Sequence, residues 1–123
     1  MIQLTIVSPE QKRREIEVLK LRKEAERQAY EALRPLRIEK MVETIFNTVK
    51  KEIEQSESDY GCWVTIWEEK LEGSYSEKEE AIKIIEEMYD SAGYKVSFDY
   101  YSQSWQTRTG KLGYFHISWF ENK

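Results

Sequence analysis

The stretch KVSFDYYSQSWQTRTGKLGYFHISW, residues 95–119, decides the fold. Apolar and polar side chains alternate over residues 95–101 and again over 113–119, which is the period-two pattern of β-strands. A polar segment, 102–111, joins the two runs and ends in a glycine and a lysine. The pattern predicts two strands that form a long hairpin, with 102–111 as the loop at its tip.

Two further segments carry the same alternation. Residues 62–67 alternate between apolar and polar or aromatic side chains, which predicts a third strand. At the N-terminus Ile2, Leu4 and Ile6 are separated by polar residues, and this shorter run predicts a fourth.

The first helix has a clear beginning and a clear interruption. Ser8 is placed as an N-cap, Pro9 takes the first helical position and Gln11 completes a capping box. Pro35 lacks the backbone N–H of a helix interior, so it ends or kinks the helix near Arg34. The apolar side chains of this helix form a narrow, alanine-rich stripe, which is typical of a helix that packs on another helix or on its own copy.

Two more helices follow. Ser76 and Glu79 predict a capping box for the later helix, and Gly93 predicts a left-handed end to it. The earlier one has the strongest 3/4 periodicity in the chain, carried by Ile38, Met41, Val42, Ile45, Phe46, Val49 and Ile53.

These elements predict an α+β fold in a single domain, 1–123, with a long N-terminal helix and two further helices packed on a small antiparallel-rich sheet. The side chains expected to point toward the helices are Val64, Ile66, Val96, Phe98, Phe115, Ile117 and Trp119. Those expected on the opposite face are Trp63, Trp67, Asp99, Tyr101, Tyr114, His116 and Ser118.

The outer face is richer in aromatic residues than a solvated sheet face. Contiguous exposed apolar surface marks an interface or a ligand site. Two interpretations remain open: the first helix or a second subunit covers this face, or the face binds a ligand.

The chain offers little for catalysis. It has one histidine, His116, and one cysteine, Cys62, which is too few for the usual zinc sites, and no nucleophile-elbow or phosphate-loop motif accompanies them. We expect structural roles for both residues, with no catalytic residue, no metal and no cofactor. The sequence therefore predicts that the protein is not an enzyme.

Charge and hydropathy restrict the partners. Residues 10–40 hold ten Lys or Arg against seven Asp or Glu, but acids interleave with the bases, and the whole chain has a net charge of −4. This pattern indicates a solvated helix and argues against a nucleic-acid partner. No apolar run approaches the ~20 residues of a membrane span, and a single cysteine fits a reducing, cytoplasmic location.

Binding chemistry concentrates in and beside the predicted loop. Trp105 and Tyr101 offer flat rings for stacking, and Arg108 offers a donor fork for a phosphate or carboxylate. Hydrogen-bonding side chains of the same segment, able to contact a base edge or a ribose, are Gln106, Thr107 and Thr109. This set predicts a pocket for a nucleotide-like small molecule, with a solvated hairpin tip as the alternative.

The pieces GYKV at 93–96 and YFHISW at 114–119, separated by the polar segment, resemble a C-terminal pattern of small, mostly uncharacterised proteins of bacteriophages that infect Gram-positive hosts. The resemblance covers the last quarter of the chain. It implies a phage protein that acts in the host cytoplasm, and small phage proteins often counter host defence. Some of these, the Thoeris anti-defence proteins, are oligomeric sponges that sequester cyclic nucleotide-like signals without cleaving them.

Two hypotheses follow. The first is a non-enzymatic, homo-oligomeric anti-defence sponge for a nucleotide-type immune signal, assembled through the first helix or the aromatic sheet face. The alternative is a protein-protein inhibitor of a host defence or metabolic enzyme.

Overall fold

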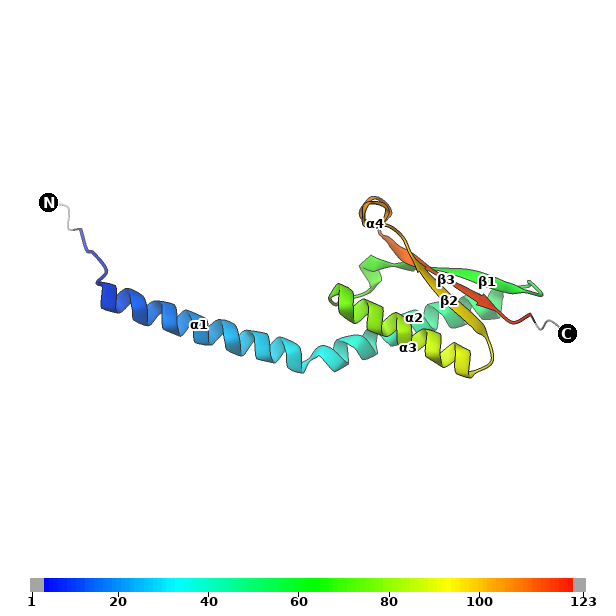
Figure 1. Cartoon of the computed structure of the whole chain (residues 1–123), viewed down its shortest axis with the longest axis horizontal. Coiled ribbons are helices and arrows are strands. Elements are labelled where there is room, and N and C mark those ends of the chain that lie inside the picture. Colours follow the sequence, from blue (N-terminus) through cyan, green and yellow to red (C-terminus); the bar gives the residue numbers. More distant parts are fainter. Residues whose placement is uncertain (1–3, 121–123) are drawn as a thin grey trace. The chain divides into compact units, whose positions relative to one another are not determined.

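The computed structural model describes residues 4–120, and the chain forms two compact units, one up to residue 34 and one from residue 35 onward. The α+β class is confirmed (Figure 1). The elements, in chain order, are α1 (Pro9–Ala32), α2 (Arg34–Gln55), β1 (Gly61–Trp67), a 3-10 turn η1 (Glu68–Lys70), α3 (Tyr75–Ser91), β2 (Lys95–Tyr100), α4 (Gln103–Thr109) and β3 (Lys111–Ser118).

Helix α1 has the N-cap and the first-turn proline that the sequence predicts, and of the predicted capping box the structure has the bond to the Ser8 hydroxyl. The Ser8 hydroxyl accepts the Gln11 N–H at 3.1 Å, and Pro9 takes the first helical position, where its missing N–H costs nothing. The helix ends at Ala32, and α2 begins with Arg34 and Pro35, so the predicted interruption is confirmed. No residue of α1 is buried.

The predicted N-terminal strand does not form where the structure describes it. Residues 4–8 have no regular secondary structure, and Ile2 lies outside the described residues. Alternation alone does not make a strand, because an extended segment gains stability only when its backbone pairs with a neighbour.

Strand β3 lies in the centre of a three-stranded antiparallel sheet with the order β1-β3-β2. Helices α2 and α3 lie on one side of this sheet (Figure 1). Their apolar stripes meet the inward side chains of the strands in one core, whose buried members include Met41, Ile45 and Val49 of α2, Ile82 and Ile85 of α3, and Val64, Ile66, Phe115 and Ile117 of the sheet.

Three of the residues expected to point inward contribute less than predicted. Val96 and Phe98 pack against the core but are only partly buried. Trp119 follows the end of β3, is half-buried, and donates its indole N–H to the Ser58 carbonyl at 3.1 Å. The fully buried side chains of the sheet thus come from β1 and β3.

The start of α3 differs from the prediction by two residues. Ser74 is the N-cap: its hydroxyl accepts the Glu77 N–H, and the Glu77 carboxylate accepts the Ser74 N–H at 2.9 Å. The prediction of Ser76 and Glu79 was wrong because the sequence contains two overlapping S-x-x-E motifs, and only the first lies where the chain turns. The helix end is confirmed, since Gly93 has a φ of +100°.

The segment between β2 and β3 is a short helix, α4, and the expectation of a loop was wrong. Ser102 is its N-cap, with its hydroxyl accepting the Trp105 N–H at 3.4 Å. Gly110, at φ +73°, ends it by donating its N–H to the Gln106 carbonyl at 2.8 Å. The helix lies at the end of the sheet where β2 leads into β3 (Figure 1).

Candidate ligand-binding face

The face of the sheet opposite α2 and α3 carries the aromatic side chains that the strand alternation assigns to it. Trp63, in the middle of β1, is 63% exposed, and Trp67, at the end of β1, is also exposed, although the strand is paired with β3. Tyr114 and His116 of β3 are half-buried beside them. The burial pattern follows from strand geometry, because residues two apart point to the same side.

These rings contact one another, one after the next, across the sheet. The Trp63 ring lies 4.3 Å from that of His116 and 5.2 Å from that of Tyr114, centroid to centroid. Tyr114 continues to Tyr101 at 5.6 Å, and Tyr101 to Trp105 of α4 at 6.3 Å. We call His116, Trp63, Tyr114, Tyr101 and Trp105 the aromatic row. It runs over β1, β3, the residue that follows β2, and α4.

Arg108 lies at the α4 end of the aromatic row. Its guanidinium carbon is 5.8 Å from the Trp105 ring centroid, a cation–π contact between residues one helical turn apart. Among residues 4–120 no carboxylate forms an ion pair with Arg108, so its donor fork faces solvent. Lys111, close to Arg108 in the sequence, adds a second positive charge. Its Nζ lies 5.2 Å from the centroid of the Trp67 ring.

The other three residues of the predicted pocket bond to the fold itself. Gln106 is only 6% exposed, and its amide donates to the Tyr101 carbonyl at 2.8 Å and to the Leu112 carbonyl at 3.1 Å. The hydroxyls of Thr107 and Thr109 donate to backbone carbonyls one turn earlier in α4. The structure therefore brings Tyr101, Trp105 and Arg108 together at the surface, while Gln106 holds α4 to the two strands.

Sequence reasoning placed Trp63, Tyr114 and His116 on the outer face but did not include them among the ligand-binding residues. The signal that could have included them is the register in which the strands pair. Trp63 lies opposite His116 across the β1–β3 pair, and Asp99 lies opposite Tyr114 across the β2–β3 pair. Rings that are directly opposite or diagonal in a sheet come within contact distance.

Two titratable groups of the sheet, Cys62 on its core side and Tyr114 on its outer face, have raised pKa values. Burial, followed by the nearby charge of Glu52, raises the pKa of the Cys62 thiol, so the thiolate that a nucleophile requires is disfavoured at neutral pH. Partial desolvation and the neighbouring Asp99 raise the pKa of Tyr114, which keeps its hydroxyl protonated. Within the described part of the chain, no cluster of three or more His, Cys, Asp or Glu could hold a metal ion.

An open hollow of about 530 Å³ lies beside the aromatic row, between α2 and β1. Trp63, Thr65 and Trp67 line it from the strand, while Asn47 and Thr48 are among the α2 residues on its other wall. A second hollow, of about 510 Å³, is lined by α1 alone, so no second element encloses it.

Comparisons of this chain with protein-family models, with curated proteins and with solved structures find no match. Across residues 4–120, no helix has the length and apolar character required to cross a membrane.

Proposed function

We propose that this protein is a non-enzymatic binding protein that holds a nucleotide-like small molecule on the aromatic row. The observation that carries the proposal is the contact of Trp105 with both Tyr101 and Arg108. A nucleotide combines a flat base with an anionic phosphate, and this end of the row presents flat rings beside a cation that has no ion-pair partner among residues 4–120.

The available interactions are of the size that nucleotide binding uses. Stacking of a base on an aromatic side chain contributes ~1–3 kcal/mol, and a hydrogen bond to a charged group contributes ~1.5–3 kcal/mol. A rigid site lowers the part of the association cost that comes from ordering side chains, so more of these contributions appear as affinity. Trp105 and Arg108 lie on a capped helix that Gln106 fixes to both strands, so the site is preorganised.

The polar residues of α4 have a different role in this proposal from the one expected from sequence. The side chains of Gln106, Thr107 and Thr109 already bond to backbone carbonyls. We assign direct ligand contacts to Tyr101, Trp105 and Arg108, and we assign the other three to the support of the helix.

In the biological setting that the sequence resemblance suggests, such a protein acts in the host cytoplasm as a phage-encoded sponge. It lowers the free concentration of an immune signalling nucleotide by binding it unchanged. Sequestration requires no catalytic group.

Isothermal titration calorimetry tests the proposal. Purified protein is titrated with a panel of cyclic dinucleotides, cyclic ADP-ribose isomers, AMP and ADP, and each ligand is recovered and analysed by mass spectrometry. We expect heat from at least one nucleotide, its recovery unchanged, and loss of the heat in Trp105→Ala and Arg108→Gln. Arg22→Gln on α1 is the matched control, since it removes an exposed arginine elsewhere. An absence of heat across the panel refutes the proposal.

A second candidate is inhibition of a host defence or metabolic enzyme by direct contact. It is favoured by the 63% exposure of Trp63, because a large exposed aromatic side chain is typical of protein interfaces. This function predicts one stoichiometric protein partner whose binding is lost in Trp63→Ala and is unaffected by nucleotides.

A further inference from the structure

Strand β1 has one unpaired edge. In the sheet order β1-β3-β2, β1 pairs only with β3. The Trp119 N–H bonds to the Tyr60 carbonyl in the same register, so even-numbered β1 residues turn their backbone groups toward β3. The alternation then directs the N–H and C=O groups of Trp63 and Thr65 toward the free edge.

This edge lacks the usual protection against pairing. Edge strands of native proteins are blunted by charged side chains, prolines or short length. Strand β1 is seven residues long, with the sequence GCWVTIW, and contains neither a charge nor a proline. Its one irregularity, between Ile66 and Trp67, lies at the far end of the strand.

The hollow beside the free edge has an aromatic side and a polar, charged side. Trp63 and Trp67 line it from β1, Asn47, Thr48, Lys51 and Glu52 line it from α2, and Lys70 of η1 also lines it. A strand added at this edge turns alternate side chains to these two sides. The hollow therefore fits a segment whose residues alternate between apolar and polar.

The chain contains such a segment, and it has no partner strand in the described structure. Residues 4–7, Leu-Thr-Ile-Val, have no regular secondary structure, and Leu4 and Ile6 are 86% and 89% exposed. The sequence alternates from Ile2 to Ile6 and carries no charge there. An isolated alternating segment is stable as a strand only when it joins a sheet.

We propose that residues 4–7 of a second copy of this chain add to the free edge of β1 as a fourth strand. Leu4 and Ile6 then lie against Trp63 and Trp67, while Thr5 faces Asn47 and Thr48. Reciprocal exchange of the two segments is closed by a two-fold axis and gives a dimer. This inference shares Trp63 with the aromatic row, but it uses none of the residues assigned direct ligand contacts, Tyr101, Trp105 and Arg108, so its test is separate from that of the nucleotide function.

Three variants test the exchange by native molecular mass, measured with light scattering and analytical ultracentrifugation. Leu4→Lys combined with Ile6→Lys places two charges in the added strand, and neither residue is part of the core. Thr65→Pro removes the N–H that the free edge offers, a position where an edge strand tolerates proline. Ile16→Lys, an exposed apolar residue of α1, is the matched control.

We expect the wild type and Ile16→Lys to be dimers, and the double lysine variant and Thr65→Pro to be monomers. A mixture of these two monomers restores a dimer, because one intact segment meets one intact edge. Circular dichroism confirms that Thr65→Pro is folded; should it unfold, the double lysine variant decides alone. A monomeric wild type, or a double lysine variant that remains dimeric, overturns the proposal.

Discussion

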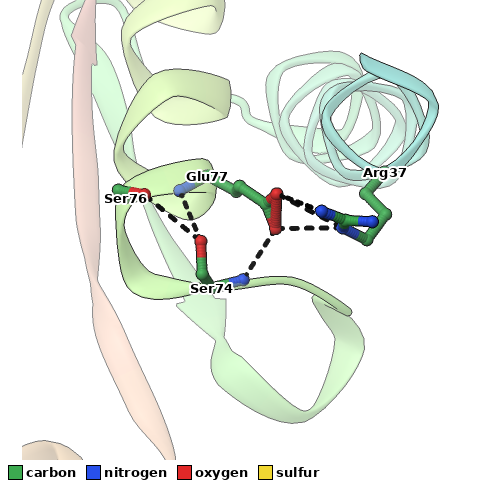
Figure 2. A network of polar contacts seen from close by, with 4 residues as sticks. All are labelled: Arg37, Ser74, Ser76 and Glu77. Carbon is green, nitrogen blue, oxygen red and sulfur yellow. Dashed lines mark hydrogen bonds and ion pairs between the residues drawn. The ribbon is translucent and has the colours of Figure 1, made fainter. Parts of the chain in front are cut away.

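Glu77 of α3 and Arg37 of α2 form a bidentate ion pair between carboxylate and guanidinium (Figure 2). Glu77 lies in the first turn of α3, and Arg37 lies near the start of α2. The Arg37 Nη2 lies 2.8 Å from Oε2, and Nε lies 3.1 Å from Oε1. The same Oε1 accepts the Ser74 N–H at 2.9 Å. Glu77 is 2% exposed, so one buried carboxylate caps α3 and fastens it to α2.

Replacement of Glu77 by alanine lowers the free energy of unfolding by about 3 kcal/mol, because it removes the bidentate carboxylate from the largely buried guanidinium of Arg37. The change is measured by urea unfolding followed by circular dichroism. Glu72→Ala, which removes an exposed acid just before α3, is the matched control and stays within about 0.5 kcal/mol of the wild type. Equal effects of the two variants would contradict a special role for the ion pair.

Acid weakens the same contact. The hydrogen bonds from Arg37, and then the backbone N–H of Ser74, lower the pKa of Glu77 from 4.5 to about 2. A pKa lowered in the folded state gives stability that is complete above pH 4.5 and is lost as the pH falls toward 2. We therefore expect the stability gap between the wild type and Glu77→Gln to shrink from pH 7 to pH 3. A gap that stays constant over this range would show that the carboxylate charge contributes nothing.

Much of the fold could be predicted because its signals are local. The 3/4 spacing of Ile38, Met41, Ile45 and Val49 predicted the buried face of α2, and all four are buried. The alternation of residues 62–67 predicted a strand and which of its faces points inward. Pro35 predicted the break before α2. Each signal depends on a few neighbouring residues and on geometry that any chain of that pattern adopts.

The errors arose where contacts between residues far apart in the sequence determine which of two local structures forms. Two capping boxes were available for α3, and the reach of Glu77 to Arg37, forty residues earlier, favours the first. The polar segment after β2 has the composition of a loop, but in the folded chain it is a helix whose buried Gln106 amide donates to two backbone carbonyls outside the helix. Ligand-facing and structural amides look the same in a sequence, so Gln106 could not be assigned without its surroundings.

Gln106→Ala destabilises the protein by about 1–3 kcal/mol, because it removes two buried hydrogen bonds and leaves a gap between α4 and the strands. Denaturant unfolding measures the loss. Gln103→Ala, an exposed glutamine of the same helix, serves as the control and has little effect. The folded Gln106→Ala variant should still bind the nucleotide, with an affinity reduced only because α4 is held less firmly. A complete loss of nucleotide binding in a folded variant would show that Gln106 contacts the ligand directly.

Gly113→Ala disrupts the sheet next to the candidate face. A Cβ at this position overlaps the Asp99 carbonyl oxygen and comes within 2.8 Å of the Phe98 ring. Overpacking of this kind costs about 1–3 kcal/mol or more, because backbone must move. Gly93→Ala is the informative comparison, since open space surrounds its Cβ and only the positive φ costs about 1–2 kcal/mol. A smaller unfolding effect for Gly113→Ala than for Gly93→Ala would contradict the close approach of Phe98.

Arg108 separates recognition of phosphate from recognition of a base. Arg108→Gln should weaken nucleotide binding by roughly 10–100-fold, which corresponds to a lost charge-assisted hydrogen bond. It should leave binding of the matching uncharged nucleoside unchanged, because stacking on Trp105 and Tyr101 remains. Trp105→Ala should weaken both ligands alike, since both have a base to stack. Calorimetry with the nucleotide and with its nucleoside measures each effect. The wild type, in which Arg108 contacts the Trp105 ring, is the reference. If Arg108→Gln reduced nucleoside binding as strongly as nucleotide binding, the guanidinium would act by holding the Trp105 ring in place rather than by binding the anion.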